Sequence, residues 1–245
     1  MTSGRDGPIL PRARHRALRK TQVFSVAARD PLRKRLDAGL AALGIALDDA
    51  AIERLLDYVD LLERWNAAYN LTAVRDPAEM VTRHLIDSLA ILPYVSGATL
   101  ADLGSGAGLP GIPLAIAAPA RETLLVDSNG KKARFLREAV RRLGLRHVRV
   151  AESRVEDVAG TFDCITARAF ASLGEMLGWG GHLLAPDGVW LAMKGRAPED
   201  ELDAVPREFR VEKVVTLNVP GLDAERHLVI LKRSASSVAP ANAGS

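Results

Sequence analysis

The ten residues from Asp102 to Gly111 have the composition and spacing of a nucleotide-binding turn. They read Asp-Leu-Gly-Ser-Gly-Ala-Gly-Leu-Pro-Gly and stand between an apolar segment at 99–101 and another at 112–118. This pattern predicts a buried strand, a glycine-rich turn and a helix. Glycine suits such a turn because backbone N–H groups must come close to a ligand and φ can be positive, and a Cβ obstructs both.

The spacing of the glycines distinguishes between classes of cofactor. Dinucleotide-binding turns follow G-x-G-x-x-G, whereas Gly104, Gly106 and Gly108 form G-x-G-x-G, with Leu109 in place of the third dinucleotide glycine. Asp102 precedes the first glycine by two residues, and a carboxylate there would repel a pyrophosphate and attract an ammonium group. S-adenosylmethionine carries such a group, so the turn favours this cofactor.

A second acid, Asp127, follows the next expected strand at 122–126. Adjacent parallel strands end at the same edge of a sheet, so this carboxylate is placed to accept hydrogen bonds from the hydroxyls of a ribose. Asp127 can also cap the helix expected at 131–143, and the two roles are compatible.

Strands and helices alternate from residue 98 onward, which predicts a mostly parallel sheet covered on both faces. Further strands are expected at 148–151, 162–167 and 189–194, and a final antiparallel pair at 211–219 and 227–232. The predicted fold class is therefore α/β and Rossmann-like, with seven strands.

Helices are expected before the sheet. Leucines at 36, 40 and 43 predict a short helix, and Asp48 can cap a longer one with an apolar face over 52–65. Asp76-Pro77-Ala78-Glu79 combines an N-cap, a proline at the first helical position and an acid at the third, and it predicts a helix that runs to about Leu92.

That last helix contains Ser88, His84 and Asp87, the residue types of a hydrolase triad. A triad requires a chain of oriented hydrogen bonds, and neighbours three or four apart on one helix rarely align as nucleophile, base and orienting acid. We therefore reject the hydrolase interpretation.

Charge is unevenly distributed along the 245 residues, whose formal net charge is +3 and whose pI is about 9.2. Residues 1–35 hold ten Lys and Arg against two Asp, a local charge of +8, and the remaining 210 residues carry −5. We expect a basic, disordered arm at 1–32, the main domain at 33–233 with a helical preface at 33–95, and a flexible tail at 234–245. The pI therefore does not identify a nucleic-acid partner for the folded part.

The sequence also limits the cellular compartments in which the protein is expected. Cys164 is the only cysteine, which excludes an internal disulfide framework and favours a reducing compartment. Pro110, Pro113 and Pro119 interrupt the most apolar stretch, which falls short of the roughly 20 residues of a membrane helix. We expect a cytoplasmic protein that acts as a monomer, away from membranes and without a metal site.

Nine Lys and Arg between residues 131 and 154 face only Glu138 and Glu152. Both a solvated helix face and a contact surface for RNA explain this local basic patch.

The missing motifs limit what a methyltransferase of this sequence could modify. Exocyclic-amine methylation uses an Asp/Asn-Pro-Pro-aromatic segment after the fourth strand, where this chain has Thr-Ala-Arg-Ala-Phe at 166–170. Pyrimidine C5 methylation uses a cysteine in a loop, whereas Cys164 lies in an expected strand, a typical core position. An acceptor with a free lone pair, such as purine N7, needs no general base.

Six segments together resemble the bacterial 16S ribosomal RNA guanine-N7 methyltransferases, also called the glucose-inhibited division protein B family. The resemblance covers about residues 36–232, and the ordered set is more specific than any one member. The segments are Trp65 to Thr72, Arg83 to Ser88, Asp102 to Gly111, Ser153 to Glu156, Arg168 to Ser172, and Glu225 to Val229.

The resemblance implies a class I S-adenosylmethionine-dependent methyltransferase fold and methylation of a guanine N7 in the 16S rRNA of the small ribosomal subunit. By match to the family, Gly104 and Leu109 contact the methionine and nucleoside parts of the cofactor, and Val155 and Glu156 hold the adenine. The match also places Arg168 at the mouth of the pocket, after the fourth strand. From the two-pronged shape of a guanidinium we expect it to bind the methionine carboxylate or an RNA phosphate there. An ion pair with an acid such as Glu156 is its alternative, purely structural role.

Two other functions remain open from the sequence. A nicotinamide or flavin oxidoreductase shares the general fold, although the glycine spacing opposes it. A non-catalytic protein that binds rRNA and keeps a relic pocket has the same motifs.

Overall fold

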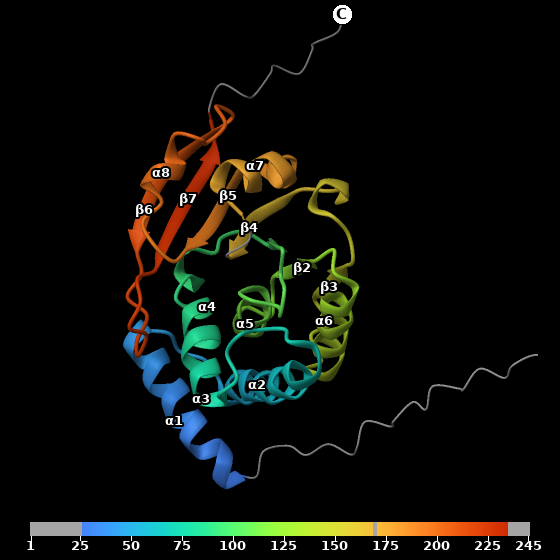
Figure 1. Cartoon of the computed structure of the whole chain (residues 1–245), viewed down its shortest axis with the longest axis vertical. Coiled ribbons are helices and arrows are strands. Elements are labelled where there is room, and N and C mark those ends of the chain that lie inside the picture. The colour runs from blue at the N-terminus through green and yellow to red at the C-terminus, as the bar shows by residue number, and fades with distance from the viewer. Residues whose placement is uncertain (1–25, 169–170, 235–245) are drawn as a thin grey trace, which may run out of the picture.

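The computed structural model describes residues 26–168 and 171–234, which form a seven-stranded sheet with helices on both faces (Figure 1). The strand order is β3-β2-β1-β4-β5-β7-β6, and β7 runs antiparallel to both of its neighbours while the other described pairs are parallel. The strands are β1 (Thr99–Leu103), β2 (Glu122–Val126), β3 (Val148–Ala151), β4 (Phe162–Arg168), β5 (Leu184–Lys194), β6 (Phe209–Thr216) and β7 (His227–Arg233). The predicted α/β fold is confirmed, including its final antiparallel strand.

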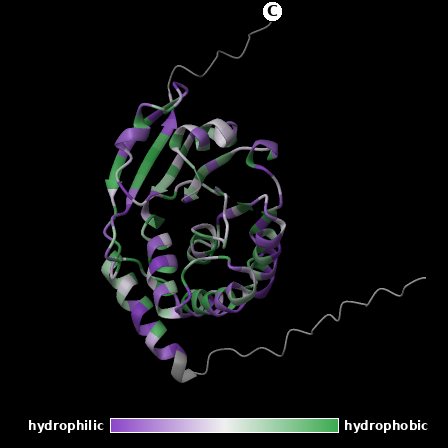
Figure 2. Cartoon of the chain, viewed as in Figure 1, coloured by the Kyte–Doolittle hydropathy of each residue, from purple (hydrophilic) through white to green (hydrophobic). Residues whose placement is uncertain are grey.

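Side chains alternate across the sheet and build two apolar layers. Leu100 and Cys164 belong to the layer under α1 (Val26–Leu43), α2 (Asp49–Tyr69), α5 (Gly111–Ala117) and α6 (Gly130–Arg142). Ala101 and Ile165, their neighbours in sequence, belong to the layer under α7 (Leu173–Gly180). Figure 2 shows β7 as largely hydrophobic, as expected for a strand covered on both faces.

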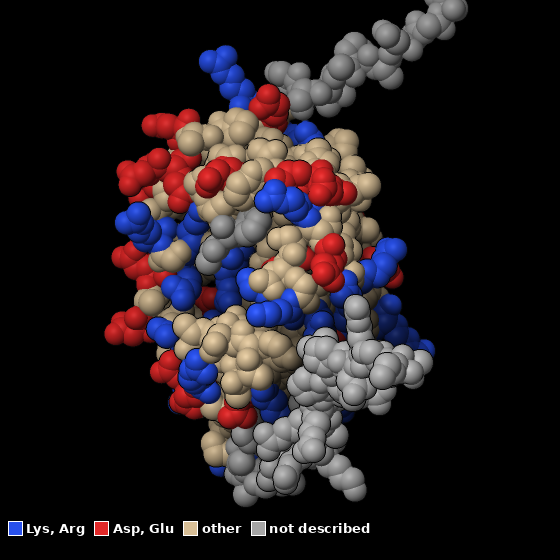
Figure 3. Space-filling model, turned by 45° about the vertical axis from the view of Figure 1, so that its right-hand side comes forward, with Lys and Arg blue, Asp and Glu red and all other residues tan. Residues whose placement is uncertain are grey.

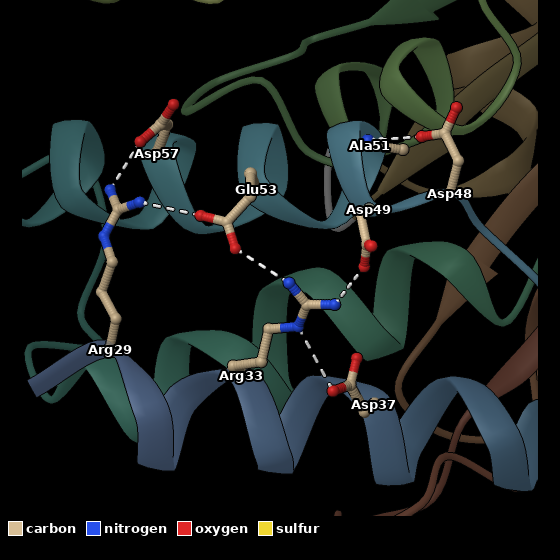
Figure 4. Close-up of polar contacts among 8 residues, drawn as sticks. All are labelled: Arg29, Arg33, Asp37, Asp48, Asp49, Ala51, Glu53 and Asp57. Atoms are coloured by element: carbon tan, nitrogen blue, oxygen red, sulfur yellow. Dashed lines mark hydrogen bonds and ion pairs between the residues drawn. The ribbon is translucent and has the colours of Figure 1, made fainter. Parts of the chain in front are cut away.

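Helix α1 begins at Val26, so the expected boundary of the basic arm at residue 32 is wrong. Arg29, which the prediction placed in the arm, and Arg33, just after it, form ion pairs with acids of α2, among them Glu53 at 3.2 and 2.9 Å (Figure 4). The apolar periodicity of the segment is weak, and these pairs together with buried Leu32 and Leu36 hold it against α2. The rest of the expected arm, residues 1–25, and the tail at 235–245 lie outside the described residues.

The helix expected from Pro77 to about Leu92 is not one continuous α-helix. Asp76 caps it as predicted, accepting a 3.1 Å hydrogen bond from the N–H of Ala78. It then passes from α3 (Pro77–Met80) through a π-helical segment (Val81–Ile86) to α4 (Asp87–Leu89), and a 3₁₀ turn (Leu92–Tyr94) follows. An apolar pattern does not reveal such a change of winding, which often accompanies functional sites.

The remaining described helical elements are short. They are the 3₁₀ turns Val155–Asp157 and Gly181–Leu183 and the helix α8 (Glu199–Leu202). Within the described ranges, no helix has the length and apolar character needed to cross a lipid bilayer.

Candidate cofactor-binding site

A cavity of about 440 Å³ lies at the carboxyl edge of the sheet, at the end of β1. Strand β1 pairs with β2 on one side and β4 on the other, so the order of strands reverses there, and ligands of open α/β sheets bind at such a point. Five of the eight expected site residues line this cavity, namely Gly104, Asp127, Val155, Glu156 and Arg168.

The glycine turn adopts the left-handed backbone that its sequence predicts. The φ angles of Gly104, Gly106 and Gly108 are 68°, 59° and 88°. Ser105 fastens the turn to β2, since its N–H donates to the carbonyl of Val126 at 2.9 Å and its Oγ accepts from the N–H of Val126 at 3.1 Å. The backbone and the hydroxyl of Ser105 thus both fasten the turn to β2.

Asp127 is buried beside this turn. Its Oδ2 accepts a 2.8 Å hydrogen bond from the N–H of Gly106, and its Oδ1 accepts one of 2.8 Å from the N–H of Asn129. Asp127 does not have the second role that the sequence allowed, the cap of α6. The cap is Asn129, whose side chain accepts from the N–H groups of Lys131 and Lys132 at 3.0 and 3.3 Å. Asp127 therefore shapes the turn and lines the cavity.

Asp102 lies beneath the turn and is not among the residues that line the cavity. It is fully buried, and its two carboxylate oxygens accept hydrogen bonds from the N–H of Gly111 at 3.1 Å and from Oγ1 of Thr166 at 3.2 Å. It points to the same face of β1 as Leu100, the face that α5 covers, which explains why it is not part of the cavity lining. Burial raises the pKa of this carboxyl to about 6.

Gly106 and Leu109 also stand behind the cavity lining. The N–H of Gly106 is engaged by Asp127, and Leu109 is buried in the apolar layer. Val155 and Glu156 begin the 3₁₀ turn after β3, where Val155 is buried and Glu156 is exposed.

Arg168 ends β4 at the mouth of the cavity, and its partner is Asp87 rather than Glu156. Its Nη1 lies 3.0 Å from Oδ2 of Asp87 and 3.4 Å from the carbonyl oxygen of Arg83. The other oxygen of Asp87 accepts from Nε of Arg226 at 2.8 Å. This ion pair with an acid of the π-helical region confirms neither of the ligand contacts expected for Arg168, and both stay predictions.

A profile of the GidB family, described as rRNA small subunit methyltransferase G, matches residues 51–229. The chain belongs to this family. It is 59% identical over 196 residues to the ribosomal RNA small subunit methyltransferase G of Stenotrophomonas maltophilia strain K279a, covering 79% of this chain and 92% of that protein. It is 52% identical over 203 residues to the protein of the same name from Neisseria meningitidis serogroup C strain 053442, covering 82% and 98%.

Solved structures support the fold of this GidB-family protein. The mitomycin 7-O-methyltransferase superposes with a TM-score of 0.53 at 15% identity, over 80% of this chain and 75% of that one. At this identity the likeness shows the fold alone. The family suspected from six sequence segments and the fold that it implies are both confirmed.

The helical preface of this GidB-family protein contributes a residue that sequence reasoning missed. Tyr58 of α2 is fully buried, and its hydroxyl donates a 2.6 Å hydrogen bond to the carbonyl oxygen of Ala107 in the glycine turn. Burial raises the pKa of Tyr58, so this hydroxyl stays protonated as a donor. A tyrosine on an apolar helix face predicts a core position, and only the fold brings it to the turn.

Asp87 and Arg226 were also missed as site residues. Both lie within segments that resemble the family, and Asp87 was otherwise considered only for the rejected hydrolase triad; 139 residues separate the two in the chain. His84, one turn before Asp87, is buried with Nε2 2.9 Å from Oγ1 of Thr72. Burial, with the charge of Arg168, lowers the pKa of His84 to about 4, so its ring is neutral near pH 7.

Cys164 lies in the core of β4, as the sequence predicts. It is fully buried, and burial raises the pKa of its thiol to about 12. A buried, protonated thiol is a poor nucleophile, which agrees with our exclusion of pyrimidine C5 methylation.

Proposed function

We propose that this protein transfers the methyl group of S-adenosylmethionine to N7 of a guanine in the 16S rRNA of the small ribosomal subunit. Membership in a family described as rRNA small subunit methyltransferase G carries the proposal. The cavity at the switch point of a methyltransferase-like sheet supplies a place for the cofactor.

The residues around the cavity fit this cofactor. Gly104 brings bare backbone to the cavity with φ at 68°, which a side chain would disfavour, and Asp127 offers a carboxylate at the end of β2 for the ribose hydroxyls. Val155 provides apolar surface for the adenine, and Arg168 provides a guanidinium for the methionine carboxylate. Asp102, Gly106 and Leu109 support the glycine turn from behind. They therefore affect cofactor binding through the shape of the turn.

The bound cofactor supplies an electrophilic methyl group on a sulfonium centre. Guanine N7 has a lone pair and no proton, so the chain must provide proximity and in-line geometry but no general base. Asp102, whose pKa is near the working range of a base, is buried with both oxygens engaged and cannot reach a substrate. The geometry therefore suits a nucleophile that needs no deprotonation.

A basic hollow beside the cavity supports an RNA substrate. It measures about 490 Å³ and is lined by Lys131, Arg134 and Arg137 of α6, together with Asn129, Gly130 and Glu152. Figure 3 shows Lys and Arg side chains across the middle of the face that it displays, with Asp and Glu gathered more toward the top and the left edge. Such a surface can follow the phosphates of a nucleic acid. We place the protein in the cytoplasm and infer that it acts as a monomer.

Methyl transfer from labelled S-adenosylmethionine to naked 16S rRNA and to 30S particles tests the proposal. We expect label in one of the two substrates, at a position that cleaves after borohydride and aniline treatment, the chemical signature of 7-methylguanine. The Gly104→Val variant is the control, because a β-branched residue resists a φ of 68° and would occupy the cavity edge. Transfer to neither substrate by a folded wild-type protein would overturn the proposal and favour a non-catalytic rRNA-binding role.

A further inference from the structure

Asp87 joins two arginines that come from distant parts of the chain. It is 2% exposed and lies directly after the π-helical segment. Arg168 at the end of β4 contacts one of its oxygens at 3.0 Å, and Arg226, just before β7, contacts the other at 2.8 Å. We call these three residues the Asp87 cluster.

The Asp87 cluster has an excess of positive charge. One carboxylate faces two guanidiniums, whose side chains are 21% and 23% exposed, so both reach solvent. His84, on the same helical region, adds no negative charge and is itself neutral, with a pKa lowered by burial. A net charge of one unit beside a cavity attracts an anion from solution.

Some N–H donors of the two guanidiniums have no hydrogen-bond acceptor among the described residues. Within the described part of the chain, Arg168 uses Nη1 for Asp87 and Arg83, and Arg226 uses Nε for Asp87 and Nη1 for the carbonyl of Glu225. Nε and Nη2 of Arg168 and Nη2 of Arg226 donate to no described residue. A guanidinium fixed on one side by a buried carboxylate is preorganised to bind a phosphate on the other.

The two arginines differ in their relation to the cavity. Arg168 is part of its lining, whereas Arg226 is not. Because Arg168 and Arg226 contact the two oxygens of the same carboxylate, that of Asp87, Arg226 also lies close to the cavity mouth. A guanine that presents N7 at the mouth of the cavity keeps its phosphate outside the cavity, where the partly exposed guanidiniums can meet it.

We propose that Arg226 binds a backbone phosphate of the rRNA at the mouth of the cofactor cavity, and that Asp87 is the positioning residue that fixes Arg226 and Arg168 side by side. The inference rests on the proposed function for the identity of the RNA. It adds an rRNA phosphate site distinct from the cofactor contacts.

The test compares Arg226→Gln with Arg210→Gln, which removes the same charge from an exposed side chain on β6, at the far edge of the sheet. Each full-length variant is titrated with naked 16S rRNA over a range of salt, and separately with S-adenosylmethionine. We expect Arg226→Gln to weaken rRNA binding about tenfold at low salt and to reduce the slope of log K against log salt by about 0.7. Its affinity for S-adenosylmethionine should stay within about twofold of wild type, and Arg210→Gln should change neither affinity.

Equal rRNA affinity and salt slope for the two variants would overturn the inference. A loss of S-adenosylmethionine affinity that matches the loss of rRNA affinity would also overturn it, because it would assign Arg226 to the cofactor site or to folding. If Arg226→Gln is unfolded by circular dichroism, Arg226→Lys replaces it and should still bind rRNA several-fold more weakly than wild type, since lysine lacks the fork. Wild-type affinity in that variant would overturn the inference.

The same experiment separates this inference from the proposed function. Binding of rRNA by the wild type without methyl transfer contradicts the proposed function while the Arg226 comparison still stands. Methyl transfer by Arg226→Gln at saturating rRNA, with an unchanged rate, agrees with a binding role.

Discussion

The hydroxyl of Tyr58 donates a 2.6 Å hydrogen bond to the carbonyl oxygen of Ala107. The donor belongs to a helix that precedes the sheet, and the acceptor belongs to the glycine turn at the candidate cofactor site. Both groups are buried, so the bond joins the helical preface to the turn. The preface is therefore part of the site and not a separate appendage.

We expect Tyr58→Phe to destabilise the protein by about 1–3 kcal/mol, because the buried carbonyl of Ala107 would lose its donor. The turn would loosen with it, and affinity for S-adenosylmethionine should fall several-fold. Urea unfolding and calorimetry measure the two effects. Tyr69→Phe is the matched control on the same helix, since that ring is 40% exposed. Equal behaviour of the two variants would mean that the hydrogen bond does not support the turn.

Gly111→Ala tests the support beneath the turn. A Cβ at Gly111 would lie 2.4 Å from Cδ2 of Leu125 and 2.6 Å from Oδ2 of Asp102, so the carboxylate would have to leave its place. We expect affinity for S-adenosylmethionine to drop at least tenfold, with a lower melting temperature. Gly178→Ala is the control, because its Cβ would meet nothing within 4 Å. An affinity of wild-type size in a folded Gly111→Ala protein would contradict the role given to Asp102.

The sequence was sufficient for features that depend on local pattern. The glycine turn, the strand before it, the helix after it and the cap at Asp76 follow from residue types at fixed offsets, and the structure has them where expected. The family could be recognised because its segments keep their order over most of the chain.

Features that depend on distant partners could not be predicted in the same way. Asp102 looked like a ligand residue because it precedes a glycine turn, but strand alternation directs it to Gly111 and Thr166. The partner of Arg168 is 81 residues away on a segment whose π-helical winding has no apolar signature. Arg29 was taken for part of a basic arm because its acids lie on α2.

Asp102 should give the protein a measurable pH dependence. Its pKa is raised from 3.8 to about 6, so its contribution to stability is fully present below pH 3.8 and is lost as pH rises through 6. Asp102→Asn keeps an acceptor for Gly111 and cannot ionise. We expect wild type to lose about 2 kcal/mol relative to this variant between pH 4 and pH 7, measured by urea unfolding. A difference that is independent of pH would show that Asp102 does not titrate in this range.

The pH dependence of stability that comes from His84 should have the opposite sign. Its pKa is lowered from 6.5 to about 4, so its contribution is present above pH 6.5 and is lost as pH falls through 4. Relative to His84→Gln, wild type should therefore lose about 3 kcal/mol between pH 7 and pH 4. The unfolding free energies of both proteins at these two pH values provide the check, and a parallel pH dependence would place His84 in contact with solvent.

The contact between α1 and α2 should depend on Arg29 far more than on Arg33. Arg29 lies against three acids of α2, including Asp60, which is 3% exposed. The substitution Arg29→Gln would remove the ion pair of this buried carboxylate with the guanidinium. We expect a loss of at least about 2 kcal/mol in unfolding free energy. Arg33 pairs with Asp37, Asp49 and Glu53, whose side chains are 45–87% exposed, so water and salt screen these pairs.

Arg33→Gln is therefore the matched control, and its smaller effect should vanish in high salt while that of Arg29→Gln persists. The loss should extend to the site, because α1 also packs on the π-helical segment, with Nη1 of Arg35 3.3 Å from Oγ1 of Thr82 and Gly39 against Ile86. Urea unfolding in low and high salt, followed by rRNA titration, measures both effects. Equal losses in the two variants would show that exposure does not decide the strength of these pairs.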